Sequence, residues 1–219
     1  MHKLNVEQGS LEWHDERFGS VTGTRLQSAI GAKWDARKSC WKLGDEKVQN
    51  TLMYELLSER MSQNEVVELN TSAVIRGKEL EPFAIKAASN EREIEFTECG
   101  MLICDWVGNL KFSPDAIHEV GGVIVGGLET KCPNGKKHVE YLLNDEVPRE
   151  YFWQVIGPMI LSDSVKWWDF ASYDDRNYER GLFIIRTYRC DVEDLINESR
   201  KVLLKFLGKV DEVHMGLTF

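Results

Sequence analysis

The stretch that decides the fold is Phe112-Ser-Pro-Asp115-Ala-Ile, followed shortly by Val123-Ile-Val-Gly-Gly-Leu-Glu129-Thr-Lys131-Cys-Pro. The second segment predicts a strand, because a continuous apolar run rich in β-branched residues is typical of a buried strand. Glu129 and Lys131 are two residues apart, so strand periodicity places both side chains on one face. Two carboxylates and a lysine on neighbouring extended segments are what metal-dependent phosphodiester cleavage requires. The pattern therefore gives a nuclease as the first hypothesis.

The chemistry expected of these residues is that of a hard metal ion. Two carboxylates about 4 Å apart repel by roughly 1 kcal/mol in water and about 4 kcal/mol at an intermediate dielectric, so the cluster needs a cation. We expect Mg²⁺, bound by Asp115, Glu129 and the backbone carbonyl of Thr130, because this ion prefers oxygen ligands. Lys131 would orient or deprotonate the attacking water. A hairpin with solvated charges and a surface ion pair is the alternative interpretation.

Length and composition limit the class of protein. A chain of 219 residues with 42% hydrophobic content is long enough for one sizeable core, and we expect a single domain over residues 1–219. The uninterrupted apolar stretches are too short to cross a bilayer, and the N-terminus does not resemble a signal peptide. We therefore expect a soluble, intracellular protein. Five scattered cysteines, none in a Cys-x-x-Cys pair, predict reduced thiols and argue against a disulfide framework or a zinc knuckle.

The net charge of −9 is unfavourable for a protein that binds DNA, since Lys and Arg supply most of the non-specific affinity for phosphate. The charges are segregated along the chain, however. Basic residues concentrate in 33–42 and 131–138, and acidic residues in 91–98 and 191–198. A basic track on an acidic body would reconcile the total charge with DNA binding.

Periodicity and capping residues predict a mixed α/β fold in which a central mixed β-sheet is flanked by helices. Helices are expected from Ser10 to Arg17, after Thr22 or Thr24, after Asp45, from about 70–72 to Ala88 with a kink or restart at Pro82, from Pro148 to Gln154 with a break at Gly157-Pro158, and after a cap at Asp191. Strands are expected at 101–106, 110–112, 123–131, 165–173 and 182–190, with a turn at Gly108-Asn109.

Five blocks of sequence together resemble a known family. They are Leu11-Glu-Trp-His-Asp-Glu-Arg17-Phe-Gly-Ser-Val-Thr22-Gly-Thr24, Arg76-Gly-Lys-Glu-Leu-Glu81-Pro, Ser113-Pro-Asp115, Leu128-Glu129-Thr-Lys131-Cys-Pro and Tyr151-Phe-Trp-Gln154-Val. In this order they resemble the phage lambda exonuclease (YqaJ-type viral recombinase) family of PD-(D/E)XK nucleases. The resemblance implies a restriction-endonuclease-like core.

The resemblance also implies a function. A member of this family would be a Mg²⁺-dependent exonuclease, with Mn²⁺ able to substitute and one or two ions per subunit. It would degrade one strand of linear double-stranded DNA from the 5′ end and leave a 3′ single-stranded overhang for a single-strand annealing protein in recombination. A ring-shaped homotrimer would thread DNA through a central channel lined by the basic residues. Such a protein is phage- or prophage-encoded and acts in the cytoplasm of a bacterial host.

Matching positions imply roles for single residues. Asp115 and Glu129 match the metal ligands, and Lys131 matches the catalytic lysine. Glu81 matches a helix-borne acid that approaches the metal or its water, and a solvated helix acid is the alternative. The residues implied in DNA or 5′-phosphate binding are Arg17, Thr24 and Arg37, and those lining the active site are Ser113, Tyr151 and Gln154. A surface arginine at 17 and a helix cap at Thr24 are the alternatives.

Two positions depart from the family pattern. Ala116 replaces the glycine that commonly follows Ser-Pro-Asp, and Ile156 replaces a second glutamine.

Two other functions are also compatible with the sequence. One is an endonuclease of the same superfamily, either restriction-type or structure-specific, and the other is a non-catalytic scaffold that binds DNA ends.

Overall fold

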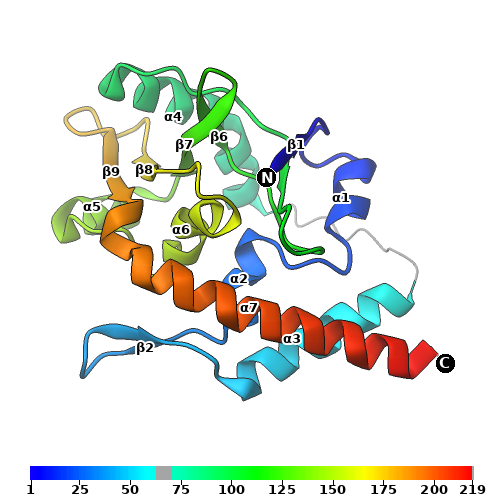
Figure 1. Ribbon diagram of the computed structural model, residues 1–219. Helices are drawn as coiled ribbons and strands as arrows, with labels where there is room; N and C mark the ends of the chain where they lie inside the picture. The colour runs from blue at the N-terminus through cyan, green and yellow to red at the C-terminus, as the bar shows by residue number, and fades with distance from the viewer. Residues whose placement is uncertain (63–70, 219) are drawn as a thin grey trace. The chain divides into compact units, whose positions relative to one another are not determined.

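A computed structural model describes residues 1–62 and 71–218 (Figure 1). The chain divides into two compact units. Unit 1 comprises residues 1–66, 100–113 and 192–219, and unit 2 comprises residues 67–99 and 114–191. Each unit is described by itself below, and the single domain over 1–219 stays a prediction.

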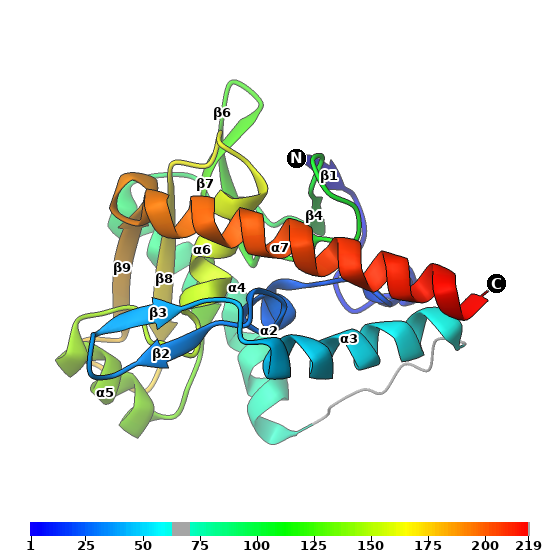
Figure 2. The ribbon, with the colours of Figure 1, turned by 60° about the horizontal axis from the view of Figure 1, so that its bottom comes forward.

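Unit 1 combines helices with two small antiparallel sheets. Its helices are α1 (Leu11–Arg17), α2 (Leu26–Ile30), α3 (Glu46–Met61) and, from Val192 onward, α7 (Arg189–Thr218), with a 3₁₀ turn η1 (Gly23–Arg25). One sheet has the order β1-β4-β5, formed by β1 (His2–Leu4), β4 (Met101–Ile103) and β5 (Lys111–Phe112). The other is the hairpin of β2 (Lys33–Asp35) and β3 (Cys40–Lys42), which connects α2 to α3 along the chain and which Figure 2 shows projecting away from both helices.

The helix starts of unit 1 follow the capping residues in the sequence. The Ser10 hydroxyl accepts a hydrogen bond from Trp13 N at 3.2 Å, and the Asp45 carboxylate accepts one from Val48 N at 3.1 Å. Both caps satisfy amide groups that have no partner within the helix. Thr22 occupies the cap position of η1 without a side-chain hydrogen bond. The predicted helices after Ser10 and Asp45 are therefore confirmed.

Unit 2 is built on a four-stranded mixed sheet with the order β6-β7-β8-β9. Its strands are β6 (Ala116–Val120), β7 (Val123–Lys131), β8 (Trp167–Tyr173) and β9 (Leu182–Tyr188). Strands β7 and β8 are parallel, and the other neighbouring pairs are antiparallel. The helices of this unit are α4 (Ser72–Arg92), α5 (Gly135–Asn144) and α6 (Phe152–Leu161). The predicted mixed sheet flanked by helices is confirmed.

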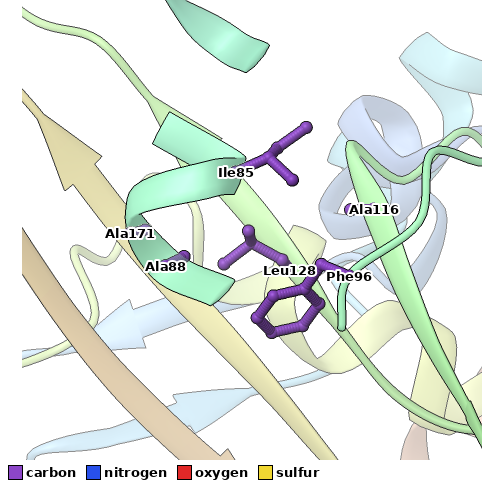
Figure 3. Close-up of a cluster of buried hydrophobic side chains, with 6 residues drawn as sticks. All are labelled: Ile85, Ala88, Phe96, Ala116, Leu128 and Ala171. Atoms are coloured by element: carbon purple, nitrogen blue, oxygen red, sulfur yellow. The ribbon is translucent and has the colours of Figure 1, made fainter. Parts of the chain in front are cut away.

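Helices cover both faces of this sheet. On one face, Ile85 and Ala88 of α4 pack with Phe96, Ala116, Leu128 and Ala171 in a buried cluster, shown in Figure 3. On the other face, Phe170 contacts the rings of Tyr141 in α5 and of Tyr151 just before α6. Neighbouring residues of a strand point to opposite faces of a sheet. Phe170 of β8 therefore packs in the layer of α5 and α6, and Ala171 packs in the layer of α4.

Close packing on β7 requires glycine at two positions. A Cβ atom on Gly126 would lie 2.2 Å from the Trp167 ring, and one on Gly127 would lie 2.2 Å from the Trp168 ring. The indoles of β8 therefore lie directly against the backbone of β7. This contact fixes the position of β7, the strand that ends in Glu129 and Lys131, against β8.

Several predicted boundaries differ from the structure. The first half of the chain is not purely helical, because it contains the β2–β3 hairpin. Strand β6 and helix α5 were not predicted. Helix α7 begins at Arg189, so Asp191 lies in its first turn and does not cap it. Among the described residues, no helix is both long and apolar enough to cross a membrane, and all five cysteines are free thiols, as predicted.

Two prolines lie inside helices that continue past them. Helix α4 runs unbroken through Pro82, and α6 starts at Phe152 and runs through Pro158. The predicted start at Pro148 and the predicted break at Gly157-Pro158 are therefore wrong. An internal proline costs about 3 kcal/mol, but α6 is buried from Val155 to Leu161. Burial of that apolar segment offsets the lost hydrogen bond.

Candidate active site

The pairing of β6 with β7 places Asp115 beside the end of β7. Ala116 pairs with Leu128, and Asp115 immediately precedes Ala116. One carboxylate oxygen of Asp115 (Oδ2) accepts hydrogen bonds from Thr130 N at 2.5 Å and from Thr130 Oγ1 at 2.8 Å. Asp115 is thereby fixed next to the residue between Glu129 and Lys131.

Glu129 and Lys131 face the same side of β7, as strand periodicity predicted. Lys131 Nζ donates to Glu129 Oε1 at 2.5 Å and to the Thr130 carbonyl oxygen at 2.9 Å. The Glu129 residue is only 5% exposed, so this ion pair is largely removed from solvent. The ammonium group thus contacts two of the three oxygen groups that were predicted to bind a metal.

Electrostatics link Glu81 to the same cluster. Burial, followed by the charge of Asp115, raises the pKa of Glu81 to about 7. Burial also raises the pKa of Glu129 to about 7, with Lys131 opposing the shift and Asp115 adding to it. Burial alone would lower the pKa of Lys131, but the charges of Glu129 and Asp115 more than offset it and raise that pKa. Lys131 is therefore a stable cation among three carboxylates.

The donor set fits a hard divalent cation. Three carboxylates and one ammonium leave an excess of negative charge, and burial, with the charge of Asp115 adding to it, raises the pKa values of Glu81 and Glu129. Asp115, Glu129 and the Thr130 carbonyl provide oxygen atoms only, which suits Mg²⁺ and not a thiol- or imidazole-preferring metal. In the described part of the chain, no three His, Cys, Asp or Glu side chains form a group that could hold a metal. The candidate ligands are accordingly two carboxylates and a peptide carbonyl.

Tyr151 lies at the edge of this cluster. It occupies the N-cap position of α6, its ring centroid is 5.2 Å from Lys131 Nζ, and its ring stacks on Phe170. Gln154 lies in the first turn of the same helix, where its backbone N–H donates to the Tyr151 carbonyl. The sheet and α6 thus bring Tyr151 next to Lys131.

A second group of candidate residues lies within unit 1. Ser113 Oγ accepts hydrogen bonds from Trp13 Nε1 at 2.8 Å and from Arg17 Nη1 at 3.3 Å. The Arg17 guanidinium also lies over the Trp13 ring, 4.1 Å from its centroid. Burial and, second, the charge of Arg25 lower the pKa of Arg17 to about 10. Among residues 1–62 and 71–218, no carboxylate forms an ion pair with Arg17, so its charge is available to an anion.

The other two predicted phosphate-binding residues belong to other elements of unit 1 than Arg17. Thr24 is exposed within η1, and its hydroxyl lies 3.4 Å from that of Thr22. Arg37 is exposed in the turn of the β2–β3 hairpin, where its backbone N–H donates to the Asp35 carboxylate. The structure therefore groups Arg17 with Ser113 and leaves Arg37 on the hairpin.

Helix α3 supports the segment that carries Thr22 and Thr24, which the sequence did not reveal. The Glu59 carboxylate accepts a hydrogen bond from Gly19 N at 2.8 Å and pairs with Arg25. The neighbouring Arg60 donates through Nε to the Gly19 carbonyl at 3.0 Å. Both sides of the Gly19 backbone are thus held by α3. No local pattern signals this, because Glu59 lies 40 residues from Gly19.

A mixed sheet with helices on both faces, with carboxylates and a lysine at the end of one strand, defines a nuclease of the PD-(D/E)XK class. Comparison with known families agrees, because residues 12–164 match the YqaJ-like viral recombinase domain. The chain therefore belongs to the YqaJ-type viral recombinase family, which includes phage lambda exonuclease.

Solved structures give the same result. The alkaline exonuclease from Laribacter hongkongensis is 27% identical with a TM-score of 0.77, and the match covers 95% of this chain and 96% of that chain. A structure of that enzyme in complex with dAMP matches with 25% identity, a TM-score of 0.71 and coverage of 95% and 98%. A phage-related exonuclease from Haemophilus somnus 129PT, at 15% identity, a TM-score of 0.55 and coverage of 90% and 96%, shares the fold. The comparison with curated proteins found no match.

Proposed function

We propose that this nuclease is a Mg²⁺-dependent exonuclease that digests one strand of linear double-stranded DNA from its 5′ end and leaves a 3′ single-stranded overhang. The observation that carries the proposal is the end of β7, where Lys131 Nζ contacts both Glu129 Oε1 and the Thr130 carbonyl oxygen beside Asp115. These groups supply oxygen ligands for a metal and a cation for the phosphate within one small volume.

Asp115, Glu129 and the Thr130 carbonyl would hold the metal, which is Mg²⁺ in this proposal, with Mn²⁺ as a substitute and one or two ions per subunit. When bound, the metal supplies neutralisation of the phosphate charge and an activated water. The raised pKa of Lys131 keeps its side chain charged, so it donates hydrogen bonds to the attacking water or the phosphate and does not act as the base.

Glu81 would approach the metal or its water from α4. Burial and, second, the charge of Asp115 raise the pKa of Glu81 to about 7, and a cation bound beside Asp115 would offset the second of these causes. Tyr151 contributes a ring beside Lys131 that limits the freedom of the ammonium group. We assign Gln154 to the lining of the active site with Tyr151, and Ser113 stays a predicted lining residue.

The 5′ end of the DNA is assigned to residues of unit 1. Arg17 has a burial-lowered pKa and a guanidinium that no described carboxylate neutralises, so a 5′-phosphate would satisfy it. Thr24 would add a hydroxyl, and Arg37 would contact the DNA backbone from the hairpin. Binding of dAMP by the related alkaline exonuclease supports this assignment, because a nucleoside monophosphate is the product of removing one nucleotide at a time.

The assembly is also part of the proposal. In a ring-shaped homotrimer, the basic segments 33–42 and 131–138 would face a DNA channel, and the net charge of −9 would lie outside it. A single-strand annealing protein would receive the 3′ overhang. The protein would be phage- or prophage-encoded and act in the bacterial cytoplasm, in keeping with its viral recombinase family.

Cleavage of linear and covalently closed circular duplex DNA tests the activity. With Mg²⁺, the protein should digest linear DNA only, and Lys131→Ala should remove the activity. Lys205→Ala changes an exposed lysine of α7 and serves as the matched control. Digestion of closed circles would refute the exonuclease, and full activity of Lys131→Ala would refute the site.

Linear DNA labelled at the 5′ or the 3′ end tests the polarity. The 5′ label should be released first, and removal of the 5′-phosphate should slow digestion. Arg17→Ala should largely abolish the difference between phosphorylated and unphosphorylated ends. The control is Arg200→Ala, which removes another arginine that lies over a tryptophan, at 5.7 Å from the Trp106 ring centroid. A full preference for phosphorylated ends in Arg17→Ala would place the phosphate elsewhere.

A further inference from the structure

Arg76, in the second turn of α4, connects three parts of unit 2. Its Nη1 donates to the carbonyl oxygens of Cys132 and Pro133, at 3.1 and 3.3 Å. Its Nη2 donates to the carboxylates of Asp174 at 3.0 Å and Asp175 at 2.5 Å. Cys132 directly follows Lys131, so one guanidinium joins α4, the chain after β7 and the segment after β8.

The acceptor Asp174 is itself held rigidly. The residue is 2% exposed, its backbone N–H donates to the Gly181 carbonyl at 2.9 Å, and its carboxylate also accepts from Arg176 Nε at 2.8 Å. A Cβ atom on Gly135 would lie 3.2 Å from Asp174 Oδ2, so the chain after β7 packs closely against this carboxylate. Arg76 is therefore bound to a fixed point of the sheet.

Little else anchors the first half of α4. Among the side chains that the structure describes from Ser72 to Phe83, none is buried, and the buried stripe of the helix begins at Ala84. Pro82 has no N–H, so the helix lacks the hydrogen bond that would otherwise close this turn. The direction of the first half of α4 is therefore weakly determined by the helix and depends on side-chain contacts.

Glu81 lies between the two anchor points of α4. Arg76 precedes it by five residues, and the apolar cluster that contains Ile85 and Ala88 follows it. We propose that Arg76 is a positioning residue, which sets Glu81 relative to Glu129 and Lys131 by tying α4 to the carbonyls that follow β7. The proposal rests on the proposed role of Glu81. It predicts that Arg76 acts on catalysis through Glu81 and not on the binding of DNA.

A double-mutant cycle tests this coupling. Arg76→Ala should lower kcat by on the order of 100-fold, the effect of displacing a reacting group by about 1 Å, while KM for linear DNA stays unchanged. The Arg76→Ala/Glu81→Gln double variant should be no slower than Glu81→Gln alone, because a misplaced and an absent carboxylate are equivalent. Arg76→Lys, whose single ammonium cannot reproduce the forked contacts, should fall between Arg76→Ala and the wild type.

Arg176→Ala is the matched control, since Arg176 pairs with the same Asp174 but donates no hydrogen bond to Cys132 or Pro133. It should keep its kcat. Thermal unfolding of every variant tests whether it folds, and Arg76→Lys replaces Arg76→Ala in the cycle if the alanine variant is unfolded. If Glu81→Gln is slowed but still measurable, and the Arg76 variant is fully active or its effect multiplies with that of Glu81→Gln, the inference is wrong and the proposed function stands. Full activity of Glu81→Gln would instead refute the proposed role of Glu81 and, with it, the positioning role.

Discussion

Lys131 lies where a cation is expected, so its removal should strengthen Mg²⁺ binding while it abolishes cleavage. Its Nζ is 2.5 Å from Glu129 Oε1 and 2.9 Å from the Thr130 carbonyl oxygen. In Lys131→Ala both oxygens lose this donor and become free to bind a metal. The site also loses a positive charge that repels the ion.

The size of the effect follows from Coulomb's law. A unit charge and a divalent ion about 4 Å apart repel by roughly 2 kcal/mol in water and roughly 8 kcal/mol at an effective dielectric constant of 20. The Lys131 side chain is 27% exposed but its partner Glu129 is buried, so water screens the interaction only in part and the lower figure is the minimum expected gain. A gain of about 2 kcal/mol corresponds to a dissociation constant roughly 30-fold lower in the variant.

Isothermal titration calorimetry with Mg²⁺, repeated with Mn²⁺, measures this difference without DNA. Lys205→Ala should bind as the wild type does, and Glu129→Gln should lose binding because it removes a proposed ligand. Equal or weaker binding by Lys131→Ala would show that the ammonium and the metal do not share these oxygens. In that case the metal assignment at the end of β7 would be wrong.

Three further substitutions test the stability of the two units, each by thermal or denaturant unfolding. Gly127→Ala would place a Cβ atom 2.2 Å from the fully buried Trp168 ring and should destabilise the protein by about 1–3 kcal/mol; unchanged stability would refute this close contact. Gly208→Ala, in α7 with no atom within 4 Å of the new Cβ, should stabilise it by about 1 kcal/mol, and a loss of stability would show a hidden clash. Burial favours a raised pKa for Glu59, but the Arg25 side chain and the backbone N–H of residue 19 lower it below its ordinary value. Glu59→Gln should therefore be less stable than the wild type near pH 7, and the difference should shrink as the pH falls below the ordinary pKa of a glutamate, because a lowered pKa stabilises the fold only where the carboxylate is ionised; a difference that does not change with pH would exclude this ion pair as its cause.

Local sequence signals were sufficient for the strand that carries the chemistry. The predicted strand 123–131 has the observed bounds of β7, because an apolar run between a glycine turn and Cys-Pro has clear ends. The caps at Ser10 and Asp45 likewise located α1 and α3, since each depends on a hydrogen bond to a residue three positions away.

Strand β6 was missed because its alternation is incomplete and its pairing is irregular. The register shifts between His118 and Glu119, which breaks the period of two. The signal that could have found it is the turn at Gly121-Gly122, where both residues have positive φ. Recognition of that hairpin would have placed Asp115 beside the end of β7.

Helix α6 shows the opposite error, because a local signal predicted a helix end that the structure does not have. Proline and the preceding glycine predict a helix end, yet α6 continues through Pro158 to Leu161 because this segment is buried. The free energy of burying apolar side chains is large enough to offset one missing hydrogen bond. That term depends on the rest of the fold and cannot be calculated from the local sequence.

The sequence by itself determined the family, the mixed α/β class, the strand β7 and the common side of Glu129 and Lys131, since these depend on residue type and on spacing along one strand. Only the tertiary structure decided that Asp115 bonds to Thr130, that Lys131 bridges Glu129 and the Thr130 carbonyl, and that burial, with the charge of Asp115, raises the pKa values of Glu81 and Glu129. It alone revealed Arg76, whose acceptors lie 56 to 99 residues away in the chain. Periodicity acts within one element, whereas these contacts depend on how separate elements pack, and packing depends on the whole of unit 2.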